Sequence, residues 1–258
     1  MSLTLLSAAD ATKSTPVSEA DKTKSTTTLD SRLVSFVKPR SFEADQYRML
    51  RYAIERACPT ESSRVIAVTS AVPGDGKTLT AVNLAGSIAK GGQSRVLLVD
   101  ADLRRPAIAK VLGHDHTRRG WGLVDAIHDR RLSLEQIAWH LDAFNLAVVT
   151  SRRPHSDTYE LLSSGRFEEL VKEARQRFDY IVIDCPPVLP APDSRLLAEF
   201  IDGYVVIVAA DKTPRRLVEE TLTLLGPSKI LGLVFNRESY KNSRYGRYYY
   251  AYTARPQR

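Results

Sequence analysis

The chain has 258 residues, of which 43% are apolar, and a formal net charge of +7. This length suits one α/β domain with flexible ends, and the apolar fraction is enough for a hydrophobic core. No run of about 18 apolar residues is present and the N-terminus lacks a basic region, so we expect neither a transmembrane helix nor a signal peptide. The two cysteines, Cys58 and Cys185, are far apart and predict reduced thiols in a cytoplasmic protein.

The two ends of the chain differ in composition from its middle. Residues 1–40 are rich in Ser, Thr, Ala, Lys and Asp and hold few large apolar side chains, which predicts a disordered leader. Residues 237–258 show neither a helical nor a strand period, and we expect them to form a flexible tail. This tail has a net charge of +5, so most of the basic excess belongs to it and says little about the folded part.

Between these ends, apolar strands alternate with helices over residues 41–236. An amphipathic helix at 42–57 comes first, and an apolar, β-branched run at 63–70 then predicts a buried strand. Six such strands with helical crossovers predict an α/β fold, with a mostly parallel sheet and helices on both faces. Such folds bind ligands at the carboxyl ends of their strands. The other predicted elements are a helix at 79–89, strands at 95–101, 144–150, 179–185, 203–210 and 229–236, and helices near 158–177, 193–200 and 213–225.

The segment AVPGDGKT, residues 71–78, lies between the first strand and its helix, which is the setting of a phosphate-binding loop. Gly74 and Gly76 let the backbone fold so that its N–H groups point at a phosphate. Lys77 offers a charge to the β- and γ-phosphates, and Thr78 offers a hydroxyl to Mg²⁺. Ala71 replaces the usual first glycine, but alanine is small and we expect the loop to form. The predicted nucleotide-binding residues of this P-loop are Pro73, Gly74, Asp75, Gly76, Lys77, Thr78 and Leu79, with ATP and Mg²⁺ as ligands.

Three aspartates lie at the ends of predicted strands. Asp100 and Asp102 follow the second strand, and residues two apart in an extended chain point the same way. Both carboxylates can therefore face the γ-phosphate and its Mg²⁺. Asp184 ends the strand at 179–185, in the position of an acid that holds Mg²⁺ directly or through water. The alternative is that these aspartates only cap helices or shape turns.

Asn236 closes the last predicted strand. Its side-chain amide offers both a donor and an acceptor, which suits the edge of an adenine ring. An asparagine that only forms a turn is the alternative interpretation.

Six of the eleven tyrosines fall in the predicted tail, without helical or strand spacing. A P-loop in the same chain favours phosphate acceptors. One alternative is a binder of single-stranded nucleic acid, in which tyrosines stack and arginines supply charge, and another is a docking segment. We expect no nucleic acid as a partner. The tyrosines are Tyr240, Tyr245, Tyr248, Tyr249, Tyr250 and Tyr252.

Together, TSAVPGDGKT, LLVDADLRRP, YIVIDCPPV and the tyrosine-rich tail resemble the bacterial tyrosine kinases, or BY-kinases, over residues 42–258. These are P-loop kinases of capsule and exopolysaccharide synthesis, related in fold to the MinD/ParA ATPases. MinD and ParA carry a lysine near the start of the loop where this chain has Val72, which favours the kinase over an ATPase switch. The family often has PNP before the helix near 158, and here the segment is RRPHSD, residues 152–157.

The resemblance implies an ATP-dependent kinase that phosphorylates its own tail, with Lys77, Asp100, Asp102 and Asp184 as catalytic residues. Asp100 and Asp102 are both candidates for the base. It also implies a ring of subunits, a membrane copolymerase as activator, and recruitment from the cytoplasm to the inner face of the membrane.

The ring prediction depends on the helix at 42–57. The family has an E-x-x-R-x-x-R pattern there, and Asp45, Arg48 and Arg51 have the same spacing with aspartate in place of glutamate. Residues at this spacing share a broad helix face. The alternative is a charged face exposed to solvent.

Overall fold

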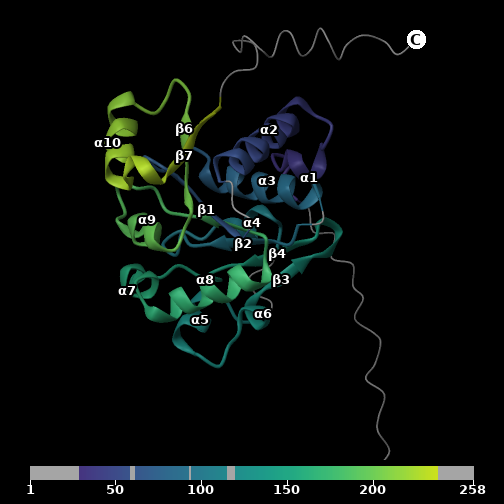
Figure 1. Ribbon diagram of the computed structural model, residues 1–258, viewed down its shortest axis with the longest axis vertical. Coiled ribbons are helices and arrows are strands. Elements are labelled where there is room, and N and C mark those ends of the chain that lie inside the picture. The colour runs from purple at the N-terminus through teal and green to yellow at the C-terminus, as the bar shows by residue number, and fades with distance from the viewer. Residues whose placement is uncertain (1–28, 59–61, 93, 115–119, 238–258) are drawn as a thin grey trace, which may run out of the picture.

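The computed structural model describes residues 29–58, 62–92, 94–114 and 120–237. They form an α/β fold around one seven-stranded sheet with the order β3-β4-β2-β5-β1-β6-β7 (Figure 1). All strand pairs are parallel except β3 with β4, which confirms the predicted mostly parallel sheet. The strands are β1 Arg64–Ser70, β2 Val96–Asp100, β3 Trp139–Leu141, β4 Leu146–Val149, β5 Tyr180–Asp184, β6 Gly203–Ala209 and β7 Ile230–Asn236.

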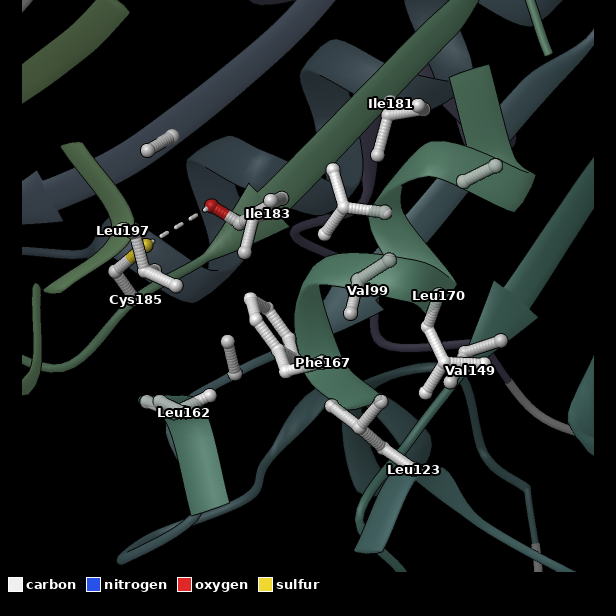
Figure 2. Close-up of a cluster of buried hydrophobic side chains, with 14 of the residues drawn as sticks. Val99, Leu123, Val149, Leu162, Phe167, Leu170, Ile181, Ile183, Cys185 and Leu197 are labelled. Carbon is white, nitrogen blue, oxygen red and sulfur yellow. Dashed lines mark hydrogen bonds between the residues drawn. The ribbon is translucent and has the colours of Figure 1, made fainter. Parts of the chain in front are cut away.

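The central strands are buried on both faces, which explains why they are continuous apolar runs rather than alternating patterns. In β1, Val65 and Ala67 belong to one hydrophobic cluster, whereas Ile66 and Val68 belong to the cluster on the opposite face. Figure 2 shows part of the first cluster, where Phe167 lies among aliphatic side chains. The sheet therefore holds its strand ends rigidly, and the loops that leave those ends have fixed starting points.

Helices cover both faces of the sheet, as the sequence predicted. Figure 1 shows α1, α2 and α3 on one side and α5 to α8 on the other. The helix after the P-loop, α3, is buried from residue 80 to residue 89 because it lies between the sheet and α2. The helices are α1 Val34–Val37, α2 Phe42–Ala57, α3 Lys77–Lys90, α4 Ile108–Val111, α5 Leu123–His128, α6 Leu134–Ile137, α7 Thr158–Leu162, α8 Gly165–Arg177, α9 Asp193–Leu196 and α10 Arg215–Leu225, with short 3₁₀ turns at Asp142–Phe144, Leu197–Glu199 and Pro227–Lys229.

The predicted boundary of the disordered leader at residue 40 is wrong, because residues 29–40 are folded and contain α1. Leu33 and Phe36 are buried in the cluster against α3. Gly86 makes this packing possible, since a Cβ there would come within 2.4 Å of the Phe36 ring. Two well-placed apolar side chains dock this segment, although its average composition resembles that of a disordered chain.

Two further differences concern short elements. The sequence did not predict β3, whose three residues are too few to show a strand period. The helix predicted near 158–177 is two helices, because Ser164 accepts a hydrogen bond from the Phe167 N–H and starts α8 anew. Within the described part of the chain, no helix combines the length and the apolar character needed to cross a bilayer.

Candidate active site

The P-loop connects β1 to α3 and has the backbone that its two glycines predicted. Gly74 has a φ of 89° and Gly76 a φ of 100°, a region that side chains disfavour. Gly76 is also needed for space, because a Cβ there would come within 2.0 Å of the Asn236 amide nitrogen. Ala71 is fully buried and does not have a positive φ, which explains why alanine can stand at the first position of the loop.

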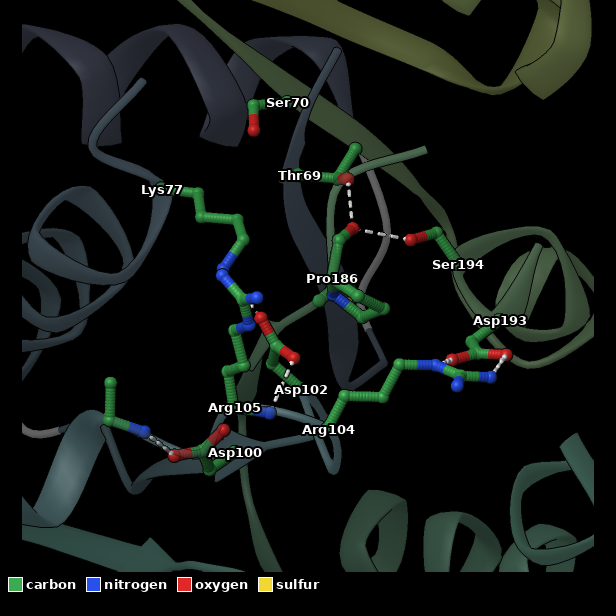
Figure 3. A network of polar contacts seen from close by, with 12 residues as sticks. Thr69, Ser70, Lys77, Asp100, Asp102, Arg104, Arg105, Pro186, Asp193 and Ser194 are labelled. Atoms are coloured by element: carbon green, nitrogen blue, oxygen red, sulfur yellow. Dashed lines mark hydrogen bonds and ion pairs between the residues drawn. The ribbon is translucent and has the colours of Figure 1, made fainter. Parts of the chain in front are cut away.

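The three predicted aspartates meet beside the loop. Strands β2 and β5 are neighbours, and their register places Asp100 directly opposite Asp184. The Lys77 ammonium donates a hydrogen bond to Asp102 Oδ2 at 2.7 Å, and Figure 3 shows these two side chains pointing toward one another. All four predicted catalytic residues therefore lie at one point on the carboxyl edge of the sheet.

Asp184 is a buried carboxylate with few partners. Both of its oxygens are buried, and neither accepts a hydrogen bond that meets ordinary geometric limits from the described residues. Burial raises the pKa of Asp184 to about 6, although the charge of Lys77 and the hydroxyl of Thr78 lower it. A buried acid without partners is unfavourable on its own, which suggests that this one is arranged for a charged ligand.

Asp100 and Asp102 each divide their oxygens between structure and site. Asp100 Oδ2 accepts hydrogen bonds from the backbone of Ala107 and Ile108 at 2.9 and 3.0 Å, so it caps the start of α4. Asp102 Oδ1 accepts one from the backbone of Arg105 at 3.1 Å. The capping alternative is therefore correct for one oxygen of each residue, and the other oxygen remains for chemistry.

The second oxygen of Asp100, Oδ1, is buried without a partner among the described residues. Burial and the nearby charge of Asp184 raise the pKa of Asp100 to about 8, because two adjacent carboxylates resist ionising together. Burial lowers the pKa of Lys77, but the charges of Asp184, Asp102 and Asp100 outweigh that effect and the pKa is raised. Lys77 therefore carries a positive charge in a site crowded with acids.

These residues fit a magnesium ion that arrives with a nucleotide. In the described residues, no group of three His, Cys, Asp or Glu side chains lies close enough to make a complete metal cage. Mg²⁺ commonly takes one or two carboxylates and completes its ligand set with phosphates and water. The unpartnered oxygens of Asp184 are ligands of this kind, and Asp102 Oδ2, which Lys77 holds in this structure, is a second.

Asn236 lies at the loop rather than away from it. Its side chain donates a hydrogen bond to the backbone oxygen of Asp75 at 2.8 Å, which ties the end of β7 to the P-loop. This contact uses one of the two amide N–H groups, and Asn236 Oδ1 accepts a hydrogen bond from the Arg237 N–H at 2.9 Å, so its adenine role stays a prediction.

Two groups of polar contacts near the predicted site residues were not predicted. Thr213, in the turn after β6, donates a hydrogen bond from its hydroxyl to Asp75 Oδ1 at 2.8 Å. Arg104 and Thr158 both bind the buried carboxylate of Asp193, with Arg104 Nε and Thr158 Oγ1 each 2.8 Å from Oδ2, and Figure 3 shows the Arg104–Asp193 pair. No sequence signal marked these contacts, because they join residues that are far apart in the chain.

The residues predicted for ring assembly lie on α2 and do not join this site. Arg48 forms an ion pair with Asp45 and donates to the Pro39 backbone oxygen at 2.7 Å. Arg51 points into the chain, where it contacts the Ser87 backbone oxygen at 3.4 Å and Glu55 at 3.5 Å. The six predicted phosphate acceptors, from Tyr240 to Tyr252, lie outside the described residues.

This chain is similar in sequence to known proteins over most of its length. Residues 63–213 match the family described as an AAA domain. Tyrosine-protein kinase YwqD of Bacillus subtilis (strain 168) is 34% identical over 219 residues, which cover 84% of this chain and 90% of YwqD. The chain belongs to the bacterial tyrosine kinase family. The match to YwqD confirms the predicted BY-kinase family and the P-loop fold that binds nucleotides.

This BY-kinase chain is also similar to part of a longer protein and to solved structures. ExoP of Rhizobium meliloti (strain 1021), a succinoglycan biosynthesis transport protein, is 31% identical over 237 residues, but the match covers 82% of this chain and only 29% of ExoP. The crystal structure of the chimerical protein CapA2B2 has a TM-score of 0.74 at 27% identity, over 81% of this chain and 92% of that one. MinD of Pyrococcus furiosus, at a TM-score of 0.56 and 23% identity over 69% and 73% of the two chains, shares the fold.

Proposed function

We propose that this chain is an ATP-dependent kinase that transfers the γ-phosphate of ATP to tyrosines in its own C-terminal tail. The observation that carries the proposal is the meeting of Lys77 with three acids, two of which, Asp100 and Asp184, have buried oxygens without partners among the described residues, beside a loop built for phosphate. Six tyrosines in the last 19 residues of the same chain supply the acceptors.

In the proposed reaction, the P-loop amides and Lys77 hold the β- and γ-phosphates. Lys77 pairs with Asp102 in this structure, so the ammonium exchanges a carboxylate for a phosphate when ATP binds. Fixed donors around the γ-phosphate stabilise the charge that develops on it during transfer. Mg²⁺, held by Thr78, Asp102 and Asp184, would neutralise part of the phosphate charge.

The acceptor needs help because a tyrosine hydroxyl has a pKa near 10. Asp100 and Asp102 are the two candidate bases for its proton, and each has one oxygen that is not used as a cap. The tyrosine oxygen then forms a bond to the γ-phosphorus, the bond from that phosphorus to the β-phosphate oxygen breaks, and ADP leaves. The proton stays on the aspartate until water takes it.

The tail is long enough for transfer between subunits. About 22 extended residues span at most roughly 70–80 Å, which reaches a neighbouring active site. We place the kinase in a ring assembled through α2, at the inner face of a membrane and activated by a membrane protein of polysaccharide export. The matches to YwqD and to part of ExoP support this setting. Each phosphotyrosine adds about −1.5 to −2 charges, so three would cancel the tail's charge of +5 and release it from the ring.

The test uses purified full-length protein with ATP and Mg²⁺, with and without a membrane activator, followed by mass spectrometry of the tail. Phosphate on the tail tyrosines of the wild type, and none in Lys77→Met, is the expected result. Lys172→Met is the control, because Lys172 lies on the surface of α8 in an ion pair with Glu168. Unmodified tyrosines under all these conditions would contradict the proposal.

A MinD/ParA-like ATPase switch is the second candidate, since MinD shares the fold. Such a switch hydrolyses ATP and transfers nothing to protein. Val72 at the position of the MinD/ParA lysine favours the kinase. Phosphate release without any anti-phosphotyrosine signal would select the switch.

A further inference from the structure

The turn between β6 and α10, residues 210–214, lies against the P-loop. The Lys212 ammonium is 3.5 Å from the position that a Cβ atom on Gly74 would occupy. Lys212 is 135 residues beyond Lys77 in the sequence and lies outside the P-loop and the acidic strand ends. A second positive charge therefore stands beside the loop that the proposed function assigns to phosphate.

Hydrogen bonds hold this turn in place. The Thr213 hydroxyl donates to Asp75 Oδ1 at 2.8 Å, and the Thr213 N–H donates to the Ala209 oxygen at 3.0 Å. Asn236 donates to the Asp75 oxygen and accepts from the Ala210 N–H at its own backbone oxygen, each at 2.8 Å. Thr213 and Asn236 both bind Asp75 of the loop. The backbone of Lys212, which directly precedes Thr213, is therefore held in a fixed position.

The charges around Lys212 leave it available. Among the residues that the structure describes, no carboxylate lies within ion-pair distance of its ammonium. Asp75 is fully buried in the loop, and its Oδ2 lacks a hydrogen-bond donor in the described part of the chain. A buried carboxylate repels an incoming polyphosphate, and a cation on the same loop offsets that repulsion.

The loop itself supplies less positive charge than its MinD and ParA counterparts, because Val72 stands where they have a lysine. Lys212 lies at the carboxyl end of β6, on the edge of the sheet where ligands of such folds bind. We propose that Lys212 is a nucleotide-binding residue whose ammonium contacts the polyphosphate of the nucleotide held in the P-loop. This inference rests on the proposed function, and it adds a specificity for nucleotides that carry the polyphosphate chain.

The test measures the affinity of the full chain for Mg·ADP and for adenosine by calorimetry, in the wild type, Lys212→Met and Lys212→Arg. Lys212→Met is expected to weaken ADP binding about tenfold, since one partly screened charge contact is lost, and to change adenosine binding less than about twofold. Lys212→Arg keeps the charge and should restore most of the ADP affinity. Lys172→Met, a surface lysine on α8, should bind both ligands as the wild type does.

If Lys212 had only a structural role, the variants would give different results. If the lysine only braced the turn, Lys212→Met would weaken ADP and adenosine equally and lower the thermal midpoint of the free protein, and the inference would be wrong. Unchanged ADP affinity in Lys212→Met, with the wild type binding normally, would also overturn it. Failure of the wild type itself to bind ADP would instead contradict the proposed function.

Discussion

The nucleotide-facing edge of the sheet has two halves, and they are built in different ways. At the ends of β2 and β5, Asp100 and Asp184 are buried with oxygens that have no partner among the described residues, and their pKa values are raised. At the ends of β6 and β7, Thr213 and Asn236 bind Asp75 through hydrogen bonds that are already formed. The first half is under electrostatic stress without a ligand, whereas most of the second is complete.

This difference separates two tasks that a phosphotransfer site must perform. Unpartnered acids reduce the stability of the free protein and gain most when a cation arrives. Preformed hydrogen bonds fix geometry and gain little on binding. Changes in the acidic half should therefore trade stability against activity, and changes in the latch formed by Asp75, Thr213 and Asn236 should reduce affinity and stability together.

The largest effect is expected for Asp184→Asn. Loss of the carboxylate should reduce tyrosine phosphorylation about 100-fold or more, because the Mg²⁺ that would neutralise the reacting phosphate loses one of its proposed ligands. The free protein should become more stable by about 1–3 kcal/mol at neutral pH, since a buried acid with a pKa of about 6 is removed. Urea unfolding and phosphotyrosine blots measure the two effects. A variant that is inactive and also less stable would show that Asp184 is a structural residue.

Gly76→Ala tests whether the latch needs the bare backbone at this position. Alanine at a φ of 100° is strained, and its Cβ would displace the Asn236 amide. We expect a loss of about 1–3 kcal/mol in unfolding free energy and about a tenfold loss of ADP affinity. Gly165→Ala is the matched control, because Gly165 has no atom within 4 Å of an added Cβ and should lose nothing. Equal stability and equal ADP affinity of the two variants would show that the latch does not depend on a glycine at position 76.

Features that show as local patterns along the chain could be predicted from the sequence. The strand runs, the P-loop and the acids at strand ends are local patterns, and parallel strands bring their carboxyl ends to one edge whatever their order. The contact between Asp75 and Thr213 joins residues 138 apart, and nothing local marks either partner. The double use of Asp100, as a cap and as a site residue, depends on the folded structure, because Oδ2 accepts hydrogen bonds at the start of α4 while Oδ1 has no partner among the described residues.

Short elements were missed because they depend on a surface that other elements provide. The segment at 29–40 folds because Phe36 packs against Gly86 of α3, which has no side chain in the way. Strand β3 forms because it pairs antiparallel with the outer edge of β4. Its sequence, WHL, is too short to show a strand period. In both cases the decisive information lies in the partner, which composition averaged over a window does not contain.

The pH dependence of stability should distinguish the two halves. The pKa values of Asp100 and Asp184 are raised from 3.8 to about 8 and about 6, so the folded state holds protons that the unfolded state has already lost. The stability contributed by these acids is complete below about pH 4 and is lost as pH rises through 6 and 8. Mg·ADP should relieve this loss, and its stabilising effect should be larger at about pH 8.5 than at about pH 6.

Thermal midpoints with and without Mg·ADP across this range measure that effect. Asp184→Asn should remove the part of the decline near pH 6 and move the part near pH 8, which belongs to Asp100, to lower pH, because the charge of Asp184 helps to raise the pKa of Asp100. Lys172→Met should follow the wild type at every pH. A ligand effect that does not depend on pH would mean that the acidic half is not under stress in the free protein.

The smallest effect is expected for Thr213→Val, which keeps the side-chain shape and removes the hydroxyl. Asp75 would then lose the donor to Oδ1 while Oδ2 already has none among the described residues, at a cost of about 1–2 kcal/mol in unfolding free energy. ADP affinity should fall about threefold to tenfold because the turn that carries Lys212 loses its anchor. Thr213→Ser keeps the donor and is the control.

A double variant shows whether the latch works through the lysine. If Thr213 matters for affinity because it positions Lys212, Thr213→Val should weaken ADP binding in the wild type but change it little once Lys212→Met is present. The loss of stability should persist in both backgrounds, since Asp75 lacks its donor in each. Fully additive losses of affinity would show that the two residues act on the nucleotide independently, and the preformed half of the site would then be a support for the loop rather than a carrier of charge.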